Sequence, residues 1–403
     1  MNIKNKTKPT FSLMEVLIIV VLTSIIMISV TGYISFRREG AVDCRALANN
    51  PHITEFINTY NTIINEFFDE VNEAELIDAA IQGMLSELGD PHTTLLDPIV
   101  SDNLVSILRG TFEGVGILIS SYDGVPKVIQ VFEDSPAEAA GIEEGDIIKY
   151  VNDIEVSEKP APQIVEMIRN SDSREITISV ERGGELIEFN LTKANIIIPQ
   201  VHSEIFEEEN QQVGYLKIDI FSENIGSQFE RRLLELEEKG IDSLIIDVRD
   251  NTGGYLAGAN EIASLFLEEG EVIYQLRRRS ETTKERVTTS GSRSYPIYVL
   301  INNGSASASE ILAAALRDSY SGDVLLIGEV TFGKGLIQTT SVLSSGAMIR
   351  YSNAEWLTPK GETVNEVGII PEVKISLERE GNEIPTFAND NQLQEAIRRI
   401  TNR

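Results

Sequence analysis

The chain has 403 residues, of which 42% are hydrophobic and 24% charged, a globular composition with room for two or three domains. Its 63 acidic residues outnumber 34 basic ones, and the formal net charge of −29 argues against nucleic acid as a partner, because that ligand needs a basic face. The single cysteine, Cys44, excludes an intrachain disulfide and C-x-x-C sites. The three histidines show no metal-ligand spacing, so we expect no metal and no cofactor.

The first 40 residues differ in kind from the remainder. Three lysines precede an apolar run at 11–34, and two arginines follow it. About 20 apolar residues are long enough to span a bilayer as a helix, and no clear cleavage site follows. We therefore expect an uncleaved signal anchor and a single-pass cell-membrane protein, with residues 1–8 in the cytoplasm and the catalytic domain outside. The stretch TFSLMEVLI also resembles the start of type IV pilins, with Thr10 where those leaders carry glycine.

The next region, 45–96, is predicted to be helical. Apolar residues recur at helical spacing in its first half, and a second helix is expected over about 73–88. This helix stops where a glycine and then a proline follow, at Gly89 and Pro91.

The period of the apolar residues changes near residue 110. Short apolar runs separated by turns predict a small β-rich unit with one helix at 160–169 and a hairpin turn at 182–184. After Pro199, strands and helices alternate. That alternation predicts an α/β domain whose sheet is buried between helices.

Lys334 lies in a loop that is one residue short of a phosphate-binding loop. The stretch LIGEVTFGKGLIQ (326–338) follows an apolar strand and holds this lysine between two glycines. A nucleotide is one interpretation, but Gly335 stands where the loop needs Ser or Thr for magnesium. The candidate magnesium ligand, Asp247, also precedes the loop, whereas the phosphate loop normally comes first.

Three serines, Ser305, Ser307 and Ser309, alternate with alanine where a helix is expected to begin. In the structural interpretation, Ser307 and Glu310 form a capping box. The helix N-terminus also offers free N–H groups and a positive dipole to an anion. Ser307 could therefore attack a carbonyl while the N–H of Ala308 stabilises the oxyanion.

Such a nucleophile needs a base, and no histidine lies near it in sequence. A lysine serves if burial lowers its pKa enough to leave it neutral, and Lys334 lies in an apolar stretch. Ser309 is the alternative nucleophile, because successive helix residues point about 100° apart and Ser307 and Ser309 cannot both face the lysine.

Three motifs occur in order within residues 247–338: DVRDNTGGYLAGANEIASLF, GSASASEILAAAL and GEVTFGKGLIQ, and the resemblance that they carry covers roughly residues 50–375. Together they resemble the C-terminal processing peptidases, also called tail-specific serine proteases. The resemblance implies a serine endopeptidase that cuts proteins near their C-termini. It also implies an α/β fold, with a crotonase/ClpP-like protease core and an inserted β-rich PDZ domain, to which the sequence adds an N-terminal transmembrane helix.

The resemblance assigns roles at matching positions. Ser307 is the nucleophile, Lys334 the general base, and Gln338 the glutamine that positions the lysine. The Asn-Thr-Gly-Gly turn at 251–254 matches the segment that supplies a second oxyanion donor. The implied donors are the N–H groups of Ala308 and of Gly253 or Gly254.

The β-rich unit resembles a PDZ domain at GTFEGVGILI and at SPAEAAGIEEGDIIKYVNDIEV. Its loop is expected to bind the substrate's terminal carboxylate, with the peptide added as a strand beside 117–120. We therefore expect partners that are proteins or peptides with apolar C-termini. The residues of this predicted site are Phe112, Glu113, Gly114, Val115, Gly116 and Ile117.

We expect this chain to be a membrane-anchored serine endopeptidase, and it could form an oligomer. An alternative is a catalytically inactive PDZ scaffold on a peptidase-like fold. The presence of Ser307, Lys334 and Gln338 argues against that alternative. The predicted domains are a leader and anchor (1–40), a helical region on the core (45–96), a PDZ domain (97–192), the protease core (193–376) and a C-terminal segment (377–403).

Overall fold

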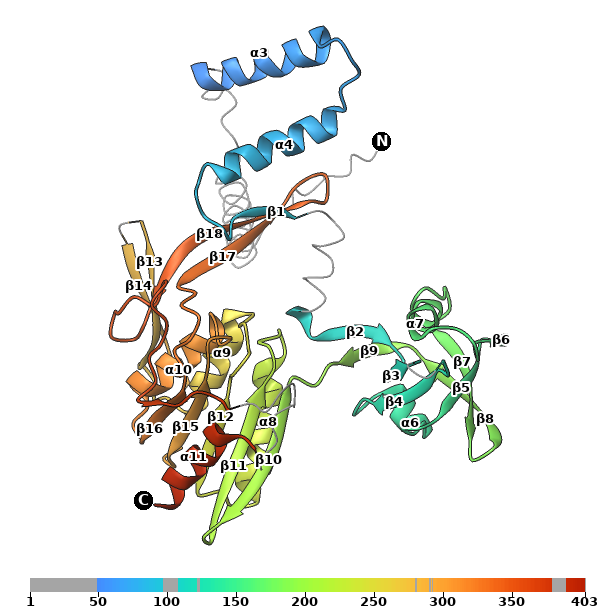
Figure 1. The fold of residues 1–403 in the computed structure, drawn as a ribbon, viewed down its shortest axis with the longest axis vertical. Coiled ribbons are helices and arrows are strands. Elements are labelled where there is room, and N and C mark those ends of the chain that lie inside the picture. Colours follow the sequence, from blue (N-terminus) through green and yellow to red (C-terminus); the bar gives the residue numbers. More distant parts are fainter. Residues whose placement is uncertain are drawn as a thin grey trace, which may run out of the picture. The chain divides into compact units, whose positions relative to one another are not determined.

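The computed structural model describes most of the chain. The chain divides into two compact units, Met1–Ile81 and Gln82–Arg403. The described residues are 49–96, 108–121, 124–279, 281–289, 291, 293–378 and 389–402. Figure 1 gives the labels of the helices and strands.

Two helices follow residue 50: α3 (Pro51–Glu66) and α4 (Glu73–Ser86). The side chain of Asn50 caps α3 by accepting a hydrogen bond from His52 N at 3.0 Å, and a proline occupies the first turn, where its missing N–H costs nothing. Neither helix has a buried residue. Both helices therefore expose apolar side chains.

The core of the second unit is a six-stranded sheet in the order β10-β11-β12-β15-β16-β19. β10 and β11 pair antiparallel, and the other pairs are parallel. Every residue of β12 and β15 is buried, as expected for central parallel strands. The strands are β10 (Val201–Glu208), β11 (Gln211–Ile218), β12 (Ser243–Asp247), β15 (Ile297–Ile301), β16 (Val324–Gly328) and β19 (Val373–Lys374).

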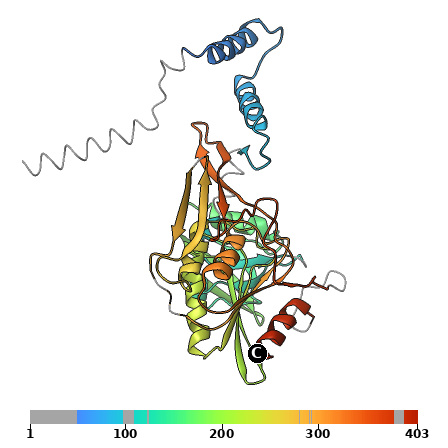
Figure 2. The same ribbon diagram turned by 90° about the vertical axis from the view of Figure 1, so that its left-hand side faces the viewer.

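Helices cover both faces of this sheet, in agreement with the predicted α/β layers (Figure 2). Alternate residues of β12 point to opposite faces, so Leu244 and Ile246 pack with α8, α9 and α10, while Ile245 packs with α11. The four helices are α8 (Ile225–Glu238), α9 (Leu256–Ser264), α10 (Ala308–Ser319) and α11 (Asn391–Thr401).

A second sheet, in the order β1-β18-β13-β14 with β17 also paired to β18, carries the segment that follows Lys334. Trp356 of β18 is fully buried, and its N–H donates to Gly335 O at 2.9 Å. This contact joins the second sheet to the lysine loop. Its strands are β1 (Thr94–Leu96), β13 (Val272–Arg278), β14 (Glu281–Arg286), β17 (Leu336–Val342) and β18 (Met348–Leu357).

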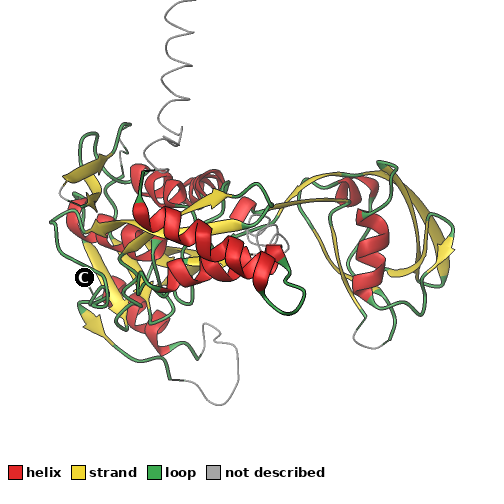
Figure 3. Ribbon diagram, turned by 90° about the horizontal axis from the view of Figure 1, so that it is seen from above, coloured by secondary structure: helices red, strands yellow, loops and turns green. Residues whose placement is uncertain are grey.

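The β-rich region forms a sheet in the order β3-β4-β5-β7-β8, with β6 on β5, and it has a hydrophobic core of its own. Figure 3 shows strands in yellow and helices in red. Gly183 and Gly184 have φ of 62° and 88°, which suits the two-residue turn of the β7–β8 hairpin. β2 and β9 pair beside it. We call residues 111–197 the PDZ unit. Its elements are β2 (Thr111–Gly114), β3 (Ile117–Ser120), β4 (Lys127–Val131), α6 (Pro136–Ala140), β5 (Ile147–Val151), β6 (Ile154–Glu155), α7 (Ala161–Arg169), β7 (Glu175–Arg182), β8 (Glu185–Thr192) and β9 (Ala194–Ile197).

The prediction of an N-terminal transmembrane helix is corrected. Among the residues that the structure describes, no helix is both long and apolar enough to cross a membrane. The apolar run at 11–34 lies outside the described residues. The fold that the structure supports is the α/β core with its PDZ unit. The expected location of the catalytic domain outside the cytoplasm stays a prediction.

Candidate active site

Ser307 lies directly before α10, with φ 55° and ψ −113°. A positive φ is uncommon outside glycine, and such strain clusters at functional sites. The other two serines of the motif are fully buried, and their hydroxyls donate to backbone carbonyls. Ser305 Oγ lies 2.7 Å from Val248 O, and Ser309 Oγ lies 2.8 Å from Asn251 O. Only the half-buried Ser307 reaches the surface.

The Asn-Thr-Gly-Gly turn packs directly against Ser307. A Cβ atom at Gly253 would lie 2.9 Å from Ser307 Cβ and 3.0 Å from Ala308 N. A Cβ atom at Gly254 would lie 2.1 Å from Phe221 O. Both glycines have positive φ, 98° and 143°. Glycine is therefore required at both positions, for conformation and for space.

The two glycines differ in what their N–H groups do. Gly253 N donates to Asn251 Oδ1 at 2.9 Å, so this donor is already engaged. Within the described residues, the N–H groups of Gly254 and Ala308 have no partner. The geometry therefore favours Gly254 over Gly253 as the second donor to an oxyanion.

Glu310 connects the serine to the lysine loop. Its carboxylate is fully buried and accepts from Ser307 N at 2.8 Å, which is one half of the predicted capping box. It also accepts from Thr331 Oγ1 at 2.5 Å, Gly333 N at 2.8 Å and Lys334 N at 3.0 Å. Burial raises the pKa of Glu310, and these hydrogen bonds oppose that rise. The spacing of Ser307 and Glu310 predicts the cap, whereas no local sequence pattern signals the contacts of Glu310 to 331–334.

Lys334 is half-buried on the loop between β16 and β17. Its backbone is held closely, because Trp356 Nε1 donates to Lys334 O at 2.9 Å and a Cβ at Gly335 would lie 2.5 Å from Asn365 N. Burial lowers the pKa of Lys334, the charge of Arg350 adds to that lowering, and Glu310 opposes it. The net direction is the one that a neutral lysine base requires.

Gln338 lies on β17, opposite Ser352 of β18. Its Nε2 atom is buried and has no hydrogen-bond partner. Within the described residues, no hydrogen bond joins the Lys334 amine to Ser307 or to Gln338. The structure thus holds the backbones of Ser307 and Lys334 together through Glu310, while the side-chain contact between them is not formed.

The PDZ unit carries a groove of about 600 Å³ between β2, β3 and α7. The edge of β3 away from β4 is unpaired in the sheet order, so a peptide can add there as a strand. Apolar side chains of Ile117, Ile119, Val165 and Ile168 line the groove beside the guanidinium-bearing Arg109 and Arg169. All six residues predicted to bind the terminal carboxylate also line it: Phe112, Glu113, Gly114, Val115, Gly116 and Ile117.

Three known families match this chain. Peptidase family S41 matches residues 212–375, the PDZ domain matches residues 127–182, and the N-terminal domain of the activating protease CtpB matches residues 39–98. The carboxy-terminal processing protease CtpA of Bacillus subtilis (strain 168) is 30% identical over 371 residues, covering 90% of this chain and 78% of CtpA. The chain belongs to the carboxy-terminal processing serine proteases of family S41.

A further curated relative agrees with this assignment to the carboxy-terminal processing proteases. Carboxy-terminal processing protease CtpB of Bacillus subtilis (strain 168) is 34% identical over 319 residues, which are 78% of this chain and 66% of CtpB. Among solved structures, the photosystem II D1 C-terminal processing protease is 26% identical with a TM-score of 0.48, covering 82% of this chain and 88% of that chain. The predicted family and enzyme class are confirmed, and the nucleotide interpretation of the Lys334 loop is set aside.

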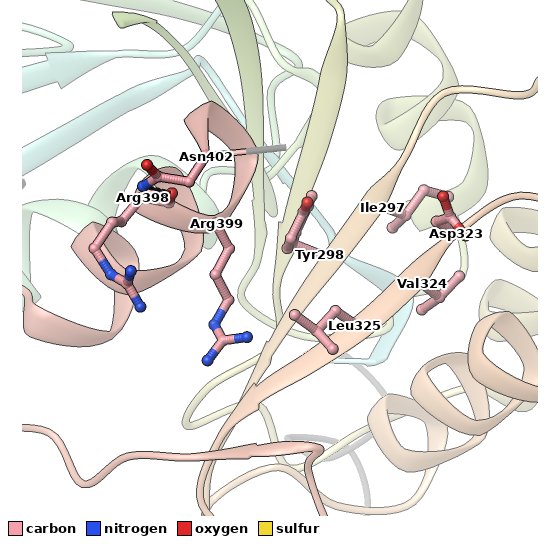
Figure 4. A pocket seen from close by; sticks show the side chains of 8 residues that line it. All are labelled: Ile297, Tyr298, Asp323, Val324, Leu325, Arg398, Arg399 and Asn402. Atoms are coloured by element: carbon pink, nitrogen blue, oxygen red, sulfur yellow. Dashed lines mark hydrogen bonds between the residues drawn. The ribbon is translucent and has the colours of Figure 1, made fainter.

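A separate pocket of about 400 Å³ lies at the opposite ends of the central strands of this peptidase (Figure 4). The first residues of β15 and β16 line this pocket, whereas Ser307 follows the other end of β15. Its two arginines, Arg398 and Arg399, both pair with Glu395 on the same helix. The pocket therefore offers no unpaired guanidinium to a ligand and no group to the peptidase reaction.

Proposed function

We propose that this peptidase cuts proteins near their C-termini by a serine–lysine dyad, in which Ser307 is the nucleophile and Lys334 the general base. One observation carries the proposal: the buried Glu310 carboxylate accepts the N–H groups of both residues, at 2.8 Å and 3.0 Å. Both residues are therefore held at one helix terminus. The competing Ser309 hydroxyl is engaged by a carbonyl and fully buried.

The reaction starts from the neutral amine of Lys334. This amine takes the proton of Ser307 Oγ as the oxygen attacks the carbonyl carbon of the scissile bond. The carbonyl oxygen becomes an oxyanion, which the N–H groups of Ala308 and Gly254 stabilise. The lysine then gives its proton to the leaving amine as the C–N bond breaks. A water molecule, deprotonated by the same lysine, hydrolyses the acyl ester and frees the serine.

The rate should rise with pH, because only neutral Lys334 acts as a base. Burial and the charge of Arg350 hold its pKa below the usual range, so kcat should reach its plateau below the pH at which an ordinary lysine titrates. Arg350→Met removes a nearby cation and should move the rise to higher pH, whereas Arg350→Lys should leave it in place. The measurement is kcat against pH for a fluorogenic peptide. A rate that falls with pH over the same interval would contradict a lysine base.

The PDZ unit is proposed to read the free C-terminus of the substrate. The segment 112–117, from β2 through the turn at Val115 and Gly116 to the start of β3, lines a groove that also holds two arginines, which suits a carboxylate. Buried Ile117, Ile119 and Ile168 make the floor of that groove apolar. An apolar C-terminal side chain therefore fits beside the bound carboxylate.

Amidation of a substrate's C-terminus should slow its cleavage by about tenfold or more. The amide removes the charge and keeps every side chain, and loss of charge-assisted hydrogen bonds costs about 1.5–3 kcal/mol. The measurement compares kcat/KM for the acid and amide forms of one peptide. Equal values for the two forms would show that the PDZ unit does not read the terminus, without affecting the dyad.

A further inference from the structure

The amide of Gln338 faces a hydroxyl that matches it. Gln338 and Ser352 are opposite each other on β17 and β18, so their side chains share one face of the sheet at about 4.5–5.5 Å between Cβ atoms. Gln338 Nε2 and Ser352 Oγ are both buried and have no hydrogen-bond partner, although the Ser352 hydroxyl lies near enough to the Asp90 carboxyl to lower its pKa. One hydrogen bond between the two side chains would satisfy both atoms.

The same face is the inner one. On β18, Ser352 and Arg350 are half-buried and pair regularly with Gln338 and Thr340 of β17, so these side chains share one face; the register shift of this pair of strands lies on the other side of Gln338. The charge of Arg350 acts on Lys334, so this face is the one directed toward the lysine loop. Gln338 and Ser352 thus lie on the lysine side of the sheet.

A turn at 90–93 supports Ser352 from the other side. Asp90 accepts hydrogen bonds from Thr93 Oγ1 at 2.6 Å and from His92 N at 3.0 Å, and Ser352 N donates to Thr93 Oγ1 at 3.3 Å. Burial would raise the pKa of Asp90, but the hydroxyls of Thr93 and Ser352 and the N–H of His92 lower it below its usual range. Asp90 is therefore an ionised acceptor beside the Ser352 hydroxyl.

β1 follows this turn, and its pairing with β18 fixes the position of the turn along β18. Thr94 is opposite Arg350 of β18, and Arg350 is in turn opposite Thr340 of β17. Figure 1 shows β1 beside β18. Ser352 therefore lies between the Asp90 turn on one side and Gln338 on the other.

We propose that Asp90 and Ser352 are positioning residues for Gln338. A serine hydroxyl has one proton to donate and two lone pairs to accept with. Ser352 donates to the Asp90 carboxylate and accepts from Gln338 Nε2, which leaves the Gln338 carbonyl oxygen directed toward the Lys334 amine. That oxygen accepts one amine hydrogen and aims the lysine lone pair at Ser307. This inference rests on the proposed dyad.

The groups that face Lys334 from each packed element fit this arrangement. Glu310 faces it from α10 and Arg350 from β18, and these two set its charge in opposite directions. Asp90 acts through Ser352: the groups that shift the pKa of its carboxyl are Thr93, Ser352 and His92, and the lysine is not among them. Asp90 therefore affects the orientation of Gln338 and of the Lys334 amine. Its substitution should lower kcat more than it shifts the pKa of Lys334.

The test is a double-mutant cycle on Ser352 and Gln338. Ser352→Ala should lower kcat by about 10- to 100-fold, as a small misplacement of a catalytic group does, with KM unchanged. On a Gln338→Ala background the same substitution should have no further effect on kcat. Ser352→Thr keeps the hydroxyl and should restore kcat. Asp90→Asn weakens the acceptor and should show the same dependence on Gln338.

The matched control is Asn353→Ala on the neighbouring, outward-facing position. It also removes one cross-strand hydrogen bond, from Asn353 Nδ2 to Thr339 Oγ1 at 2.6 Å, so it tests mere weakening of the sheet. It should leave kcat unchanged. Wild-type kcat in Ser352→Ala, or an equal loss with and without Gln338, would overturn the inference. If Ser307→Ala also keeps its activity, the proposed dyad itself fails; if Ser307→Ala is inactive, only the positioning role fails.

Discussion

Ser307→Ala should abolish peptide hydrolysis and leave the protein folded. Removal of the nucleophile of a serine hydrolase lowers kcat by about 10⁴- to 10⁶-fold. Lys334→Ala should lose as much, and Lys334→Arg should not recover it, because a guanidinium keeps its proton at any working pH. The measurement is kcat for a fluorogenic peptide, together with the melting temperature of each variant.

Ser309→Ala is the matched control for this prediction. It removes the hydrogen bond from Ser309 Oγ to Asn251 O, which is worth about 1 kcal/mol, and it leaves Ser307 in place. This variant should melt slightly earlier and still cleave the peptide. An active Ser307→Ala protein beside an inactive Ser309→Ala protein would move the nucleophile two residues along the chain.

Asp390→Ala should cause the largest loss of stability. Arg249 is buried and donates to Asp390 at 3.0 Å and 2.7 Å, to Asp247 at 2.6 Å, and to Gln392 at 2.9 Å. Exposed fractions are 9% for Arg249, 3% for Asp390 and 1% for Asp247. Removing one member of such a buried set costs about 3–5 kcal/mol, because the remaining charges lose their compensation. Urea unfolding gives the free energy directly.

Two variants separate the sources of this loss. Asp390 also caps α11 by accepting from Gln392 N and Leu393 N, and Asn keeps that cap while removing the charge. Asp390→Asn therefore reports the charge together with the acceptor for Arg249 Nη2, while the cap is kept. Arg398→Ala breaks an exposed pair with Glu395 on the same helix and should cost less than about 1 kcal/mol. An Asp390→Ala protein as stable as Arg398→Ala would show that the buried network is dispensable.

The sequence predicted those parts of the site that depend on local pattern. A serine before a helix, a lysine between glycines after a strand, and a glycine loop before a strand each carry their structure within a few residues. Ser307 and Lys334 therefore stand where they were expected. The expected loop at 112–116 is corrected: residues 112–114 belong to β2, which pairs with β9, and only Val115 and Gly116 connect β2 to β3. Their catalytic and binding roles stay predictions.

Contacts between distant segments could not be read from pattern. Glu310 reaches Lys334 across 24 positions, and Arg249 reaches Asp390 across 141. The choice between Gly253 and Gly254 likewise depends on the Asn251 side chain, which engages one N–H and leaves the other. These contacts join residues that are far apart in the sequence and close in the tertiary structure, so only the folded structure shows them.

The most direct measurement of the proposed dyad is the location of the acyl group in a trapped acyl-enzyme. The protein is mixed with an activated ester that acylates nucleophilic serines, quenched in acid, digested, and mapped by mass spectrometry. The dyad predicts the acyl group on Ser307 in the wild type and in Ser309→Ala, and no acylation in Ser307→Ala or Lys334→Arg. An acyl group on Ser309, or full acylation of Lys334→Arg, would contradict it.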